Sequence, residues 1–220
     1  GVSVPLNLVL GFLLAQAANF KLKGITVYRT LFYLPVIIPS VASGLLFMDM
    51  FQVGPSGILN NILKVAGLPE QTWFSSAKTS LATFIFMNAW NVGGGMIIWL
   101  SCFKQIPVSL YEAAELDGAN AWNRLVHITV PMSTPIIFYN LITGIIGSLQ
   151  VSSSLIVGGS NGKGIDGSLY FIAIKIYNEA FKSMNMGYAS AFAWILFLFI
   201  AVLTVVIFKR SKWVFYGGED

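Results

Sequence analysis

Charged residues are scarce in this chain, and the shortage decides its broad class. Only 10% of the 220 residues are charged, whereas 56% are hydrophobic and the mean hydropathy is +0.75. An average soluble domain has about 25% charged residues. The deficit excludes an ordinary soluble domain and predicts a membrane protein. The basic residues form no run, so nothing favours nucleic acid as a partner.

Cysteine and histidine each occur once, as Cys102 and His127. One cysteine allows no internal disulfide, and a lone histidine without companions at ligand spacing predicts no metal site. The glycine-rich stretch 158–164 lacks the first Gly and the final Ser or Thr of a phosphate-binding loop. No catalytic triad or carboxylate pair is recognisable in the apolar segments. The sequence therefore predicts no catalytic residue and no cofactor bound by this chain.

Long apolar runs make up most of the chain. A hydrocarbon core of about 30 Å needs roughly 20 apolar residues in a helix. Five runs qualify: 2–20, 31–50, 80–103, 135–157 and 187–208. They are continuous and longer than the alternating segments of a membrane barrel. We therefore expect an all-α polytopic helix bundle that forms one domain over 1–220.

Lysine and arginine predict how the bundle is oriented. If the loop 21–30 is cytoplasmic, eight basic residues lie inside and five outside, which follows the positive-inside tendency. The inside set is Lys21, Lys23, Arg29, Lys104, Arg124, Lys209, Arg210 and Lys212, and the outside set is Lys64, Lys78, Lys163, Lys175 and Lys182. The segment 104–131 and the C-terminus are then cytoplasmic, and we expect a sixth span before Gly1.

Two outer segments are expected to form short helices of their own. In 56–67, Ser56 suits an N-cap and Gly67 a left-handed end. The segment 168–184 places apolar residues on one helical face. Both are predicted to lie at the membrane surface.

The segment 104–131 is polar and punctuated by Gly and Pro, although it lies between two apolar runs. Pro107 favours a helix start, and Gly118 favours a left-handed helix end. Asn120 can cap a second helix, which Pro131 is expected to stop. The result is a compact two-helix knob whose carboxylates can pair with basic groups of a partner. These carboxylates belong to Glu112, Glu115 and Asp117.

The spacing in this knob resembles the EAA loop of permease subunits of ATP-binding-cassette importers. That pattern has Glu-Ala-Ala, a Gly six residues after the Glu, then an Ile and a Pro ten and thirteen residues beyond the Gly. The matching residues are Glu112, Ala113, Ala114, Asp117, Gly118, Ala119, Ile128 and Pro131. Leu125 and Val130 stand where Phe and Leu are usual. The resemblance implies that these residues couple the chain to an ATPase subunit.

Further stretches, at 29–44, 88–91 and 177–189, resemble the sugar-importing branch of that family. The resemblance implies a permease subunit in the bacterial cytoplasmic membrane, with ATP and Mg²⁺ bound only by partners. Those partners are two ATPase subunits, a second permease that forms a heterodimer, and an extracytoplasmic solute-binding protein. Two alternatives remain: an importer of another small solute, such as an amino acid or phosphate ester, and a secondary transporter or channel without an ATPase.

Polar side chains at membrane depth are candidates for solute contact, because they are costly there unless they face a cavity or a partner. Asn and Gln both donate and accept hydrogen bonds, which suits a neutral hydroxylated solute. The clearest polar residues at this depth are Asn88, Asn91, Asn140, Ser148, Gln150 and 152–154. The residues selected for solute contact are Asn88, Asn91, Gly95, Ser148 and Gln150. Resemblance to the maltose-type permeases places Asn88 and Ser148 at contacting positions, and Asn91 and Gly95 at others where the side chain differs. The alternative is hydrogen bonding between helices. Gly93–Gly95 could serve close packing or a gating bend.

Overall fold

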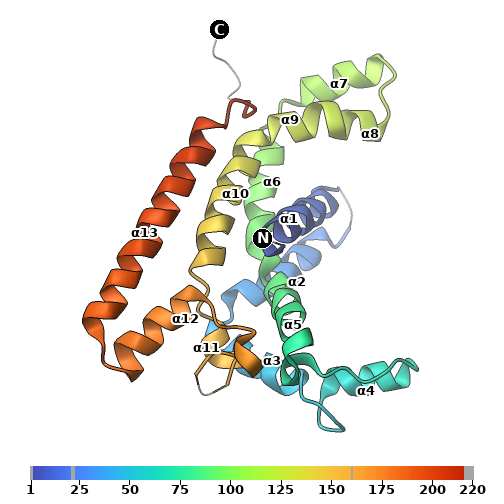
Figure 1. Ribbon diagram of the computed structural model, residues 1–220. Helices are drawn as coiled ribbons and strands as arrows, with labels where there is room; N and C mark the ends of the chain where they lie inside the picture. Colours follow the sequence, from blue (N-terminus) through green and yellow to red (C-terminus); the bar gives the residue numbers. More distant parts are fainter. Residues whose placement is uncertain (1, 21–22, 160, 216–220) are drawn as a thin grey trace.

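The computed structural model describes residues 2–20, 23–159 and 161–215, with only the backbone of Ser154 and Leu155. Lys21, one of the residues used to orient the bundle, lies outside these ranges. Every regular element within them is helical (Figure 1), which confirms the predicted all-α class.

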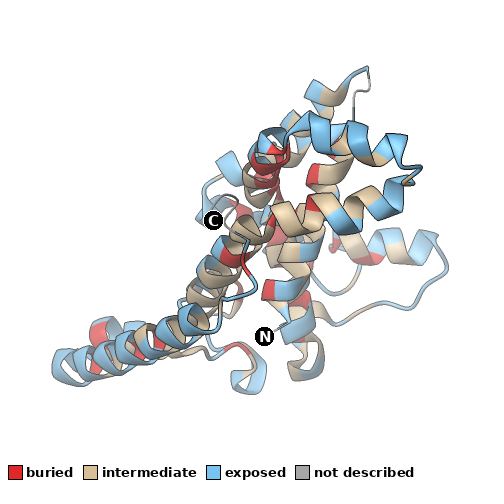
Figure 2. Ribbon diagram, turned by 90° about the horizontal axis from the view of Figure 1, so that it is seen from above, coloured by how far each residue is buried: buried red, intermediate tan, exposed pale blue. Residues whose placement is uncertain are grey.

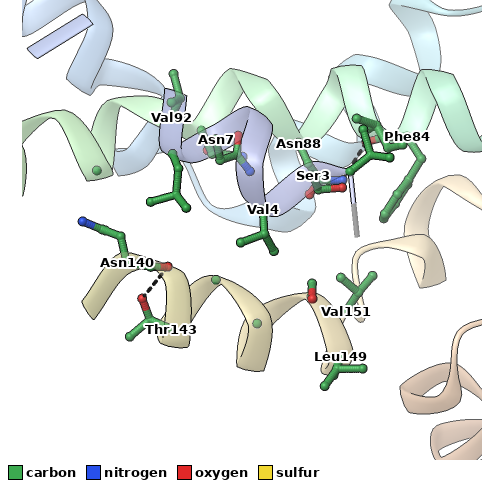
Figure 3. Close-up of a pocket in the computed structure, with 18 of the residues that line it drawn as sticks. Ser3, Val4, Asn7, Phe84, Asn88, Val92, Asn140, Thr143, Leu149 and Val151 are labelled. Carbon is green, nitrogen blue, oxygen red and sulfur yellow. Dashed lines mark hydrogen bonds between the residues drawn. The ribbon is translucent and has the colours of Figure 1, made fainter. Parts of the chain in front are cut away.

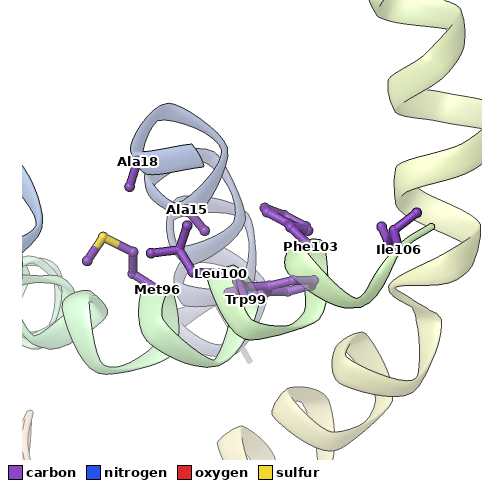
Figure 4. Packing of buried hydrophobic residues seen from close by; sticks show 7 residues of the cluster. All are labelled: Ala15, Ala18, Met96, Trp99, Leu100, Phe103 and Ile106. Carbon is purple, nitrogen blue, oxygen red and sulfur yellow. The ribbon is translucent and has the colours of Figure 1, made fainter. Parts of the chain in front are cut away.

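Two helices form the centre of the molecule: α1 (Ser3–Asn19) and α6 (Gly93–Gln105). Ala15 and Ala18 of α1 are fully buried against Met96, Trp99 and other apolar residues of α6 (Figure 4). Small side chains at this contact let the two backbones come close, which is how helices associate without a hydrophobic driving force in lipid. This cluster fixes α1 against the middle of the chain.

The predicted span 31–50 is broken rather than continuous. It comprises α2 (Ile25–Ile37) and α3 (Ser40–Met50), whose axes differ by 98°. The break lies at Pro39, which has no N–H to continue the helical ladder, and at Ile38, which is extended (ψ 127°) because proline disfavours a helical residue before it. The predicted run is therefore helical, but Pro39 divides it into two helices.

The predicted span 80–103 lies inside a single apolar stretch, 77–105. This stretch comprises α5 (Ala77–Ala89), the short 3₁₀ segment η2 (Trp90–Val92) and α6. A Cβ on Gly93 would lie 1.8 Å from the carbonyl oxygen of Phe32 in α2, whereas one on Gly95 would meet nothing within 4 Å. Close packing therefore explains Gly93, and Gly95 is left with open space.

The predicted span 135–157 is also interrupted. Helix α10 (Thr134–Leu149) ends at Gln150, and a separate short turn, α11 (Ser154–Val157), follows. The last predicted run, 187–208, corresponds to α13 (Met186–Lys209). Few residues along α13 are buried (Figure 2). Among the described residues, two helices are long and apolar enough to cross a membrane, or up to four if each bent pair counts as one span; α1 is apolar but shorter.

The outer segments are helical but start later than expected. Helix α4 (Ile58–Val65) has Gly57, and not Ser56, at its N-cap, and it ends at Gly67 with φ +72° as predicted. Its buried Asn60 accepts hydrogen bonds from Gln71 N and Trp73 Nε1. The segment 168–184 contains α12 (Ile172–Tyr177) and the π-helical η5 (Asn178–Lys182). Two short 3₁₀ turns, η1 (Trp73–Ser75) and η4 (Ile165–Gly167), precede α5 and α12.

Candidate coupling hairpin and membrane cavity

A helical hairpin projects from one end of the molecule (Figure 1). Its first arm is α7 (Val108–Leu116), which begins after the extended Pro107. The arm ends at Gly118, whose φ of +76° is the left-handed conformation predicted from the sequence. Ala119 N donates to Ala114 O at 2.8 Å and Gly118 N donates to Glu115 O at 3.1 Å. This pair of bonds is the Schellman arrangement that satisfies the last carbonyls of a helix.

The second arm begins where it was predicted but does not stop at Pro131. Asn120 Oδ1 accepts from Asn123 N at 2.8 Å and caps α8 (Ala121–Arg124). A π-helical segment, η3 (Leu125–Thr129), and a last turn, α9 (Val130–Met132), follow. The π turn is wider than an α turn, and Val130 N donates to Leu125 O, five residues back. A widened turn accommodates the Pro131 ring, so the prediction that Pro131 ends this helix was wrong.

The eight residues predicted for ATPase coupling divide between the tip and the base of the hairpin. Glu112, Ala113, Asp117 and Gly118 are exposed, whereas Ala114, Ala119, Ile128 and Pro131 are partly buried. Ile128 packs against the core cluster of α1 and α6. The tip is thus free to meet another protein while the base is joined to the bundle.

Two exposed apolar residues of the hairpin were missed by the sequence reasoning. The side chains of Leu116 and Trp122 are 91% and 69% exposed, on either side of the glycine corner. Large apolar side chains are unfavourable in water and favourable in the groove of a partner. The sequence could have indicated them, because both are large apolar residues close to the predicted Gly118 corner.

Two side-chain links join the arms of the hairpin. At the tip, Arg124 Nη1 and Glu115 Oε2 form an ion pair at 3.0 Å, and the Glu115 side chain is 71% exposed. At the base, the hydroxyls of Tyr111 and Thr129 are 2.9 Å apart, and Thr129 is 4% exposed. An exposed ion pair contributes little, about 0–1 kcal/mol. The buried hydrogen bond between Tyr111 and Thr129 is therefore expected to hold the two arms together more strongly than the exposed ion pair does.

A cavity of about 800 Å³ lies between α1, the α5–α6 stretch and α10 (Figure 3). Four of the five residues predicted for solute contact line it: Asn88, Asn91, Gly95 and Ser148. The fifth, Gln150, is exposed beyond the end of α10 and lies between two lining residues, Leu149 and Val151. The structure thus brings three candidates to the α5–α6 wall of the cavity and Ser148 to the α10 wall, and leaves Gln150 at the edge.

The cavity wall also contains polar residues outside the five selected for solute contact. Asn7 and Thr143 were not named from the sequence, whereas Asn140 was among the polar residues noted at membrane depth. Asn7 of α1 and Asn140 and Thr143 of α10 lie on facing sides (Figure 3). Asn7 Oδ1 is buried and has no hydrogen-bond partner among the described residues. Asn7 was missed because nothing local in α1 indicates which of its faces meets α10.

Most polar side chains of the wall use their hydrogens on their own helices. Asn88 Nδ2 donates to Phe84 O at 2.7 Å, and Asn140 Nδ2 donates to Ile136 O at 2.9 Å. The hydroxyl of Ser148 donates to Ile145 O at 2.8 Å. Their oxygens are left as acceptors, and no Asp, Glu, Lys or Arg is among the described lining residues. Such a wall can accept hydrogen bonds from the hydroxyls of an uncharged solute.

Comparison with known sequences gives consistent matches along the chain. Residues 7–212 match the family described as "Binding-protein-dependent transport system inner membrane component". The probable ABC transporter permease protein YesP of Bacillus subtilis is 37% identical, over 99% of this chain and 71% of its own. The lactose transport system permease protein LacF of Rhizobium radiobacter is 31% identical, over 96% of this chain and 72% of its own.

Comparison with solved structures supports the same fold. A bacterial ABC transporter involved in the import of the acidic polysaccharide alginate contains a chain that superposes with a TM-score of 0.81. The match covers 94% of this chain and 72% of that one, at 22% identity. At this identity the likeness establishes the arrangement of helices and says nothing of the solute.

Proposed function

The chain belongs to the inner-membrane components of binding-protein-dependent transport systems, and from this premise we propose that it carries a sugar or a related neutral, hydroxyl-rich solute. It is a multi-pass permease subunit of an ATP-binding-cassette importer in the bacterial inner membrane, a translocation subunit and not the ATPase. The observation that carries the choice of solute is the cavity, whose described lining is largely apolar and whose polar side chains are all uncharged. Relatives named for lactose, multiple sugars and trehalose/maltose support it.

Within this proposal, the solute contacts Asn88, Asn91, Gly95 and Ser148 in the cavity, with Gln150 at the rim. The hydroxyls of the solute donate to the free side-chain oxygens of the wall. A phosphate ester would bring a negative charge to a wall with no Lys or Arg among its described residues to neutralise it, which is unfavourable. The uncharged lining therefore favours a neutral solute over an anionic one.

The hairpin, in the same proposal, docks into a cleft of an ATPase subunit through the eight coupling residues. Two such ATPases hold ATP and Mg²⁺, and a second permease and an extracytoplasmic solute-binding protein complete the importer. Closure of the ATPases displaces the hairpin and moves α6 and α10, which carry two walls of the cavity. Ligand-driven displacement of rigid elements of this kind gives alternating access.

We also propose that the chain crosses the membrane five times. The crossings are α1, the bent pair α2–α3, the α5–α6 stretch, α10 with the turn α11 that follows it, and α13. The bent pair α2–α3 contains enough apolar residues for one span. Broken helices are tolerated at membrane depth where the irregular backbone is covered by protein.

Uptake into proteoliposomes tests the function. The chain is reconstituted with its ATPases, second permease and solute-binding protein, and radiolabelled lactose, maltose, glycerol phosphate and glutamate are offered in turn. We expect ATP-dependent uptake of a neutral sugar and none of the two anions. Uptake of glycerol phosphate or glutamate in place of a sugar would contradict the neutral-solute proposal. Uptake without ATP would point to a secondary transporter.

A further inference from the structure

A closed set of contacts joins the coupling hairpin to the two helices that form the cavity. Helix α6 continues through Ile106 and Pro107 into α7, so the first arm is attached to α6 by the chain itself. The second arm runs from α8 through η3 and α9 into α10, with a bend of 63° between the last two. Along the chain, the two arms are connected only through the corner at Gly118. Any rigidity between their bases must come from side chains.

Tyr111 and Thr129 provide that connection at the base. The hydroxyl of Tyr111 lies 2.9 Å from Thr129 Oγ1, and Thr129 Oγ1 lies 3.5 Å from Arg124 O. If Tyr111 donates to Thr129, the Thr129 hydrogen is free for the Arg124 carbonyl, which lies five residues back. The same bond thus joins the two arms and supports the π turn, whose wide geometry is a common site of local adjustment.

The contacts continue from Thr129 to α6. The hydroxyl of Ser133 donates to Thr129 O at 2.6 Å, and Cys102 Sγ donates weakly to Ser133 Oγ at 3.7 Å. Ser133 is fully buried and Cys102 is nearly so. Cys102 lies three residues after Trp99, which lines the cavity. These contacts therefore form a closed loop. It runs from α6 along the chain to Tyr111, then through hydrogen bonds to Thr129 and Ser133, and returns to α6 at Cys102.

We propose that Tyr111 and Thr129 are positioning residues that make the coupling hairpin move as one body with α6 and α10. Without their bond, the base of the second arm keeps the packing of Ile128 and Met132 and the weak contact of Ser133 with Cys102, but no described hydrogen bond joins it to the first arm there. Displacement of the tip by an ATPase is then absorbed by bending at 125–134 and does not reach the cavity. This inference rests on the proposed function, because it assigns the hairpin the role of transmitting ATPase closure.

The direct test compares solute moved per ATP hydrolysed in reconstituted importers that carry Tyr111→Phe, Thr129→Val or both. Each single change removes one hydroxyl and keeps the shape of the side chain. We expect ATP hydrolysis to persist while lactose or maltose uptake per ATP falls several-fold. The double variant should fall no further than Thr129→Val alone, because that change already removes the bond to Tyr111. Thr129→Ser keeps the hydroxyl and should restore the wild-type ratio.

Tyr139→Phe is the matched control, because Tyr139 lies exposed on α10 away from the hairpin base. A wild-type ratio in Tyr111→Phe would overturn the proposal, and so would additive losses in the double variant. Amide hydrogen exchange on the purified chain adds a readout that needs no solute. Residues 125–133 should exchange faster in Tyr111→Phe than in wild type. If neither sugar is taken up, the proposed solute fails, and unchanged exchange would then refute the positioning role by itself.

Discussion

The amides of the cavity wall show how single residues can be polar without being charged or unsatisfied. Asn88 and Asn140 each donate to the carbonyl four residues back in their own helix. This bond fixes which end of the amide faces the cavity, because only nitrogen can donate to a carbonyl. Each residue therefore offers an oriented oxygen and one remaining N–H, so it can both accept from and donate to a hydroxyl of the solute.

Replacing Asn88 with alanine removes one such acceptor. We expect the apparent affinity for a transported sugar to fall about two- to tenfold, which corresponds to a hydrogen bond worth about 0.5–1.5 kcal/mol. The maximal uptake rate should change less. Sugar-concentration curves in proteoliposomes measure both. Asn61→Ala, on exposed α4, is the control and should resemble wild type; an unchanged affinity in Asn88→Ala would remove this residue from the site.

Some single residues of the cavity could be predicted from the sequence, and others could not. Asn88 and Ser148 are polar residues in long apolar runs, so their cost in lipid singles them out. Asn7 is equally polar, but its role depends on the approach of α1 to α10. That approach is close because Gly144 leaves room for Val4, whose Cγ1 would lie 3.1 Å from a Cβ at position 144. A contact between residues so far apart has no local signature.

Helices in this protein are shaped by their interruptions as much as by their apolar content. The sequence predicted the Gly118 corner and the Asn120 cap correctly, because each depends on a backbone preference of one residue. It failed at Pro131, where the proline alone was taken as a helix stop, and at Pro39 it gave the apolar run but not the size of the bend. Pro39 does break its span, whereas the π turn before Pro131 lets that helix continue.

The contact between α2 and α6 gives a prediction for the element scale. Gly93→Ala would place a Cβ 1.8 Å from Phe32 O, so the two helices must separate. We expect a loss of stability of roughly 1–3 kcal/mol, as for other overpacked sites. Thermal unfolding of the purified chain in detergent measures it. Gly95→Ala is the neighbouring control, since nothing lies within 4 Å of its Cβ, and equal melting of the two variants would refute the argument.

The whole molecule has two differently built ends. One end carries the hairpin with exposed Leu116, and the other carries α4 and the loops around it (Figure 1). Between them the helices expose apolar side chains, most of all along α13 (Figure 2). Such a band suits lipid, where exposed apolar surface carries no cost. The two ends are therefore expected to face opposite aqueous compartments.

Cysteine labelling in intact cells tests that orientation. Leu116→Cys and Val65→Cys each place a thiol at a side chain that is 91% exposed. A membrane-impermeant maleimide added outside should label the α4 thiol and leave the hairpin thiol unlabelled until the membrane is permeabilised. The native Cys102 is buried, and the unsubstituted chain gives its background. Outside labelling at position 116 would reverse the orientation drawn from lysine and arginine.

The π segment also constrains how the length of this protein can change. A π turn holds one residue more than the α turn it replaces. Deleting a single residue between 125 and 129 would restore an ordinary α turn. Because the extra residue is held within one wider turn, the arm would keep nearly the same direction relative to α10. The restored α turn would instead bring the Pro131 ring against the carbonyl four residues back, which kinks or breaks a helix. The extra residue of this segment is therefore what allows a proline inside the arm without redirecting the hairpin.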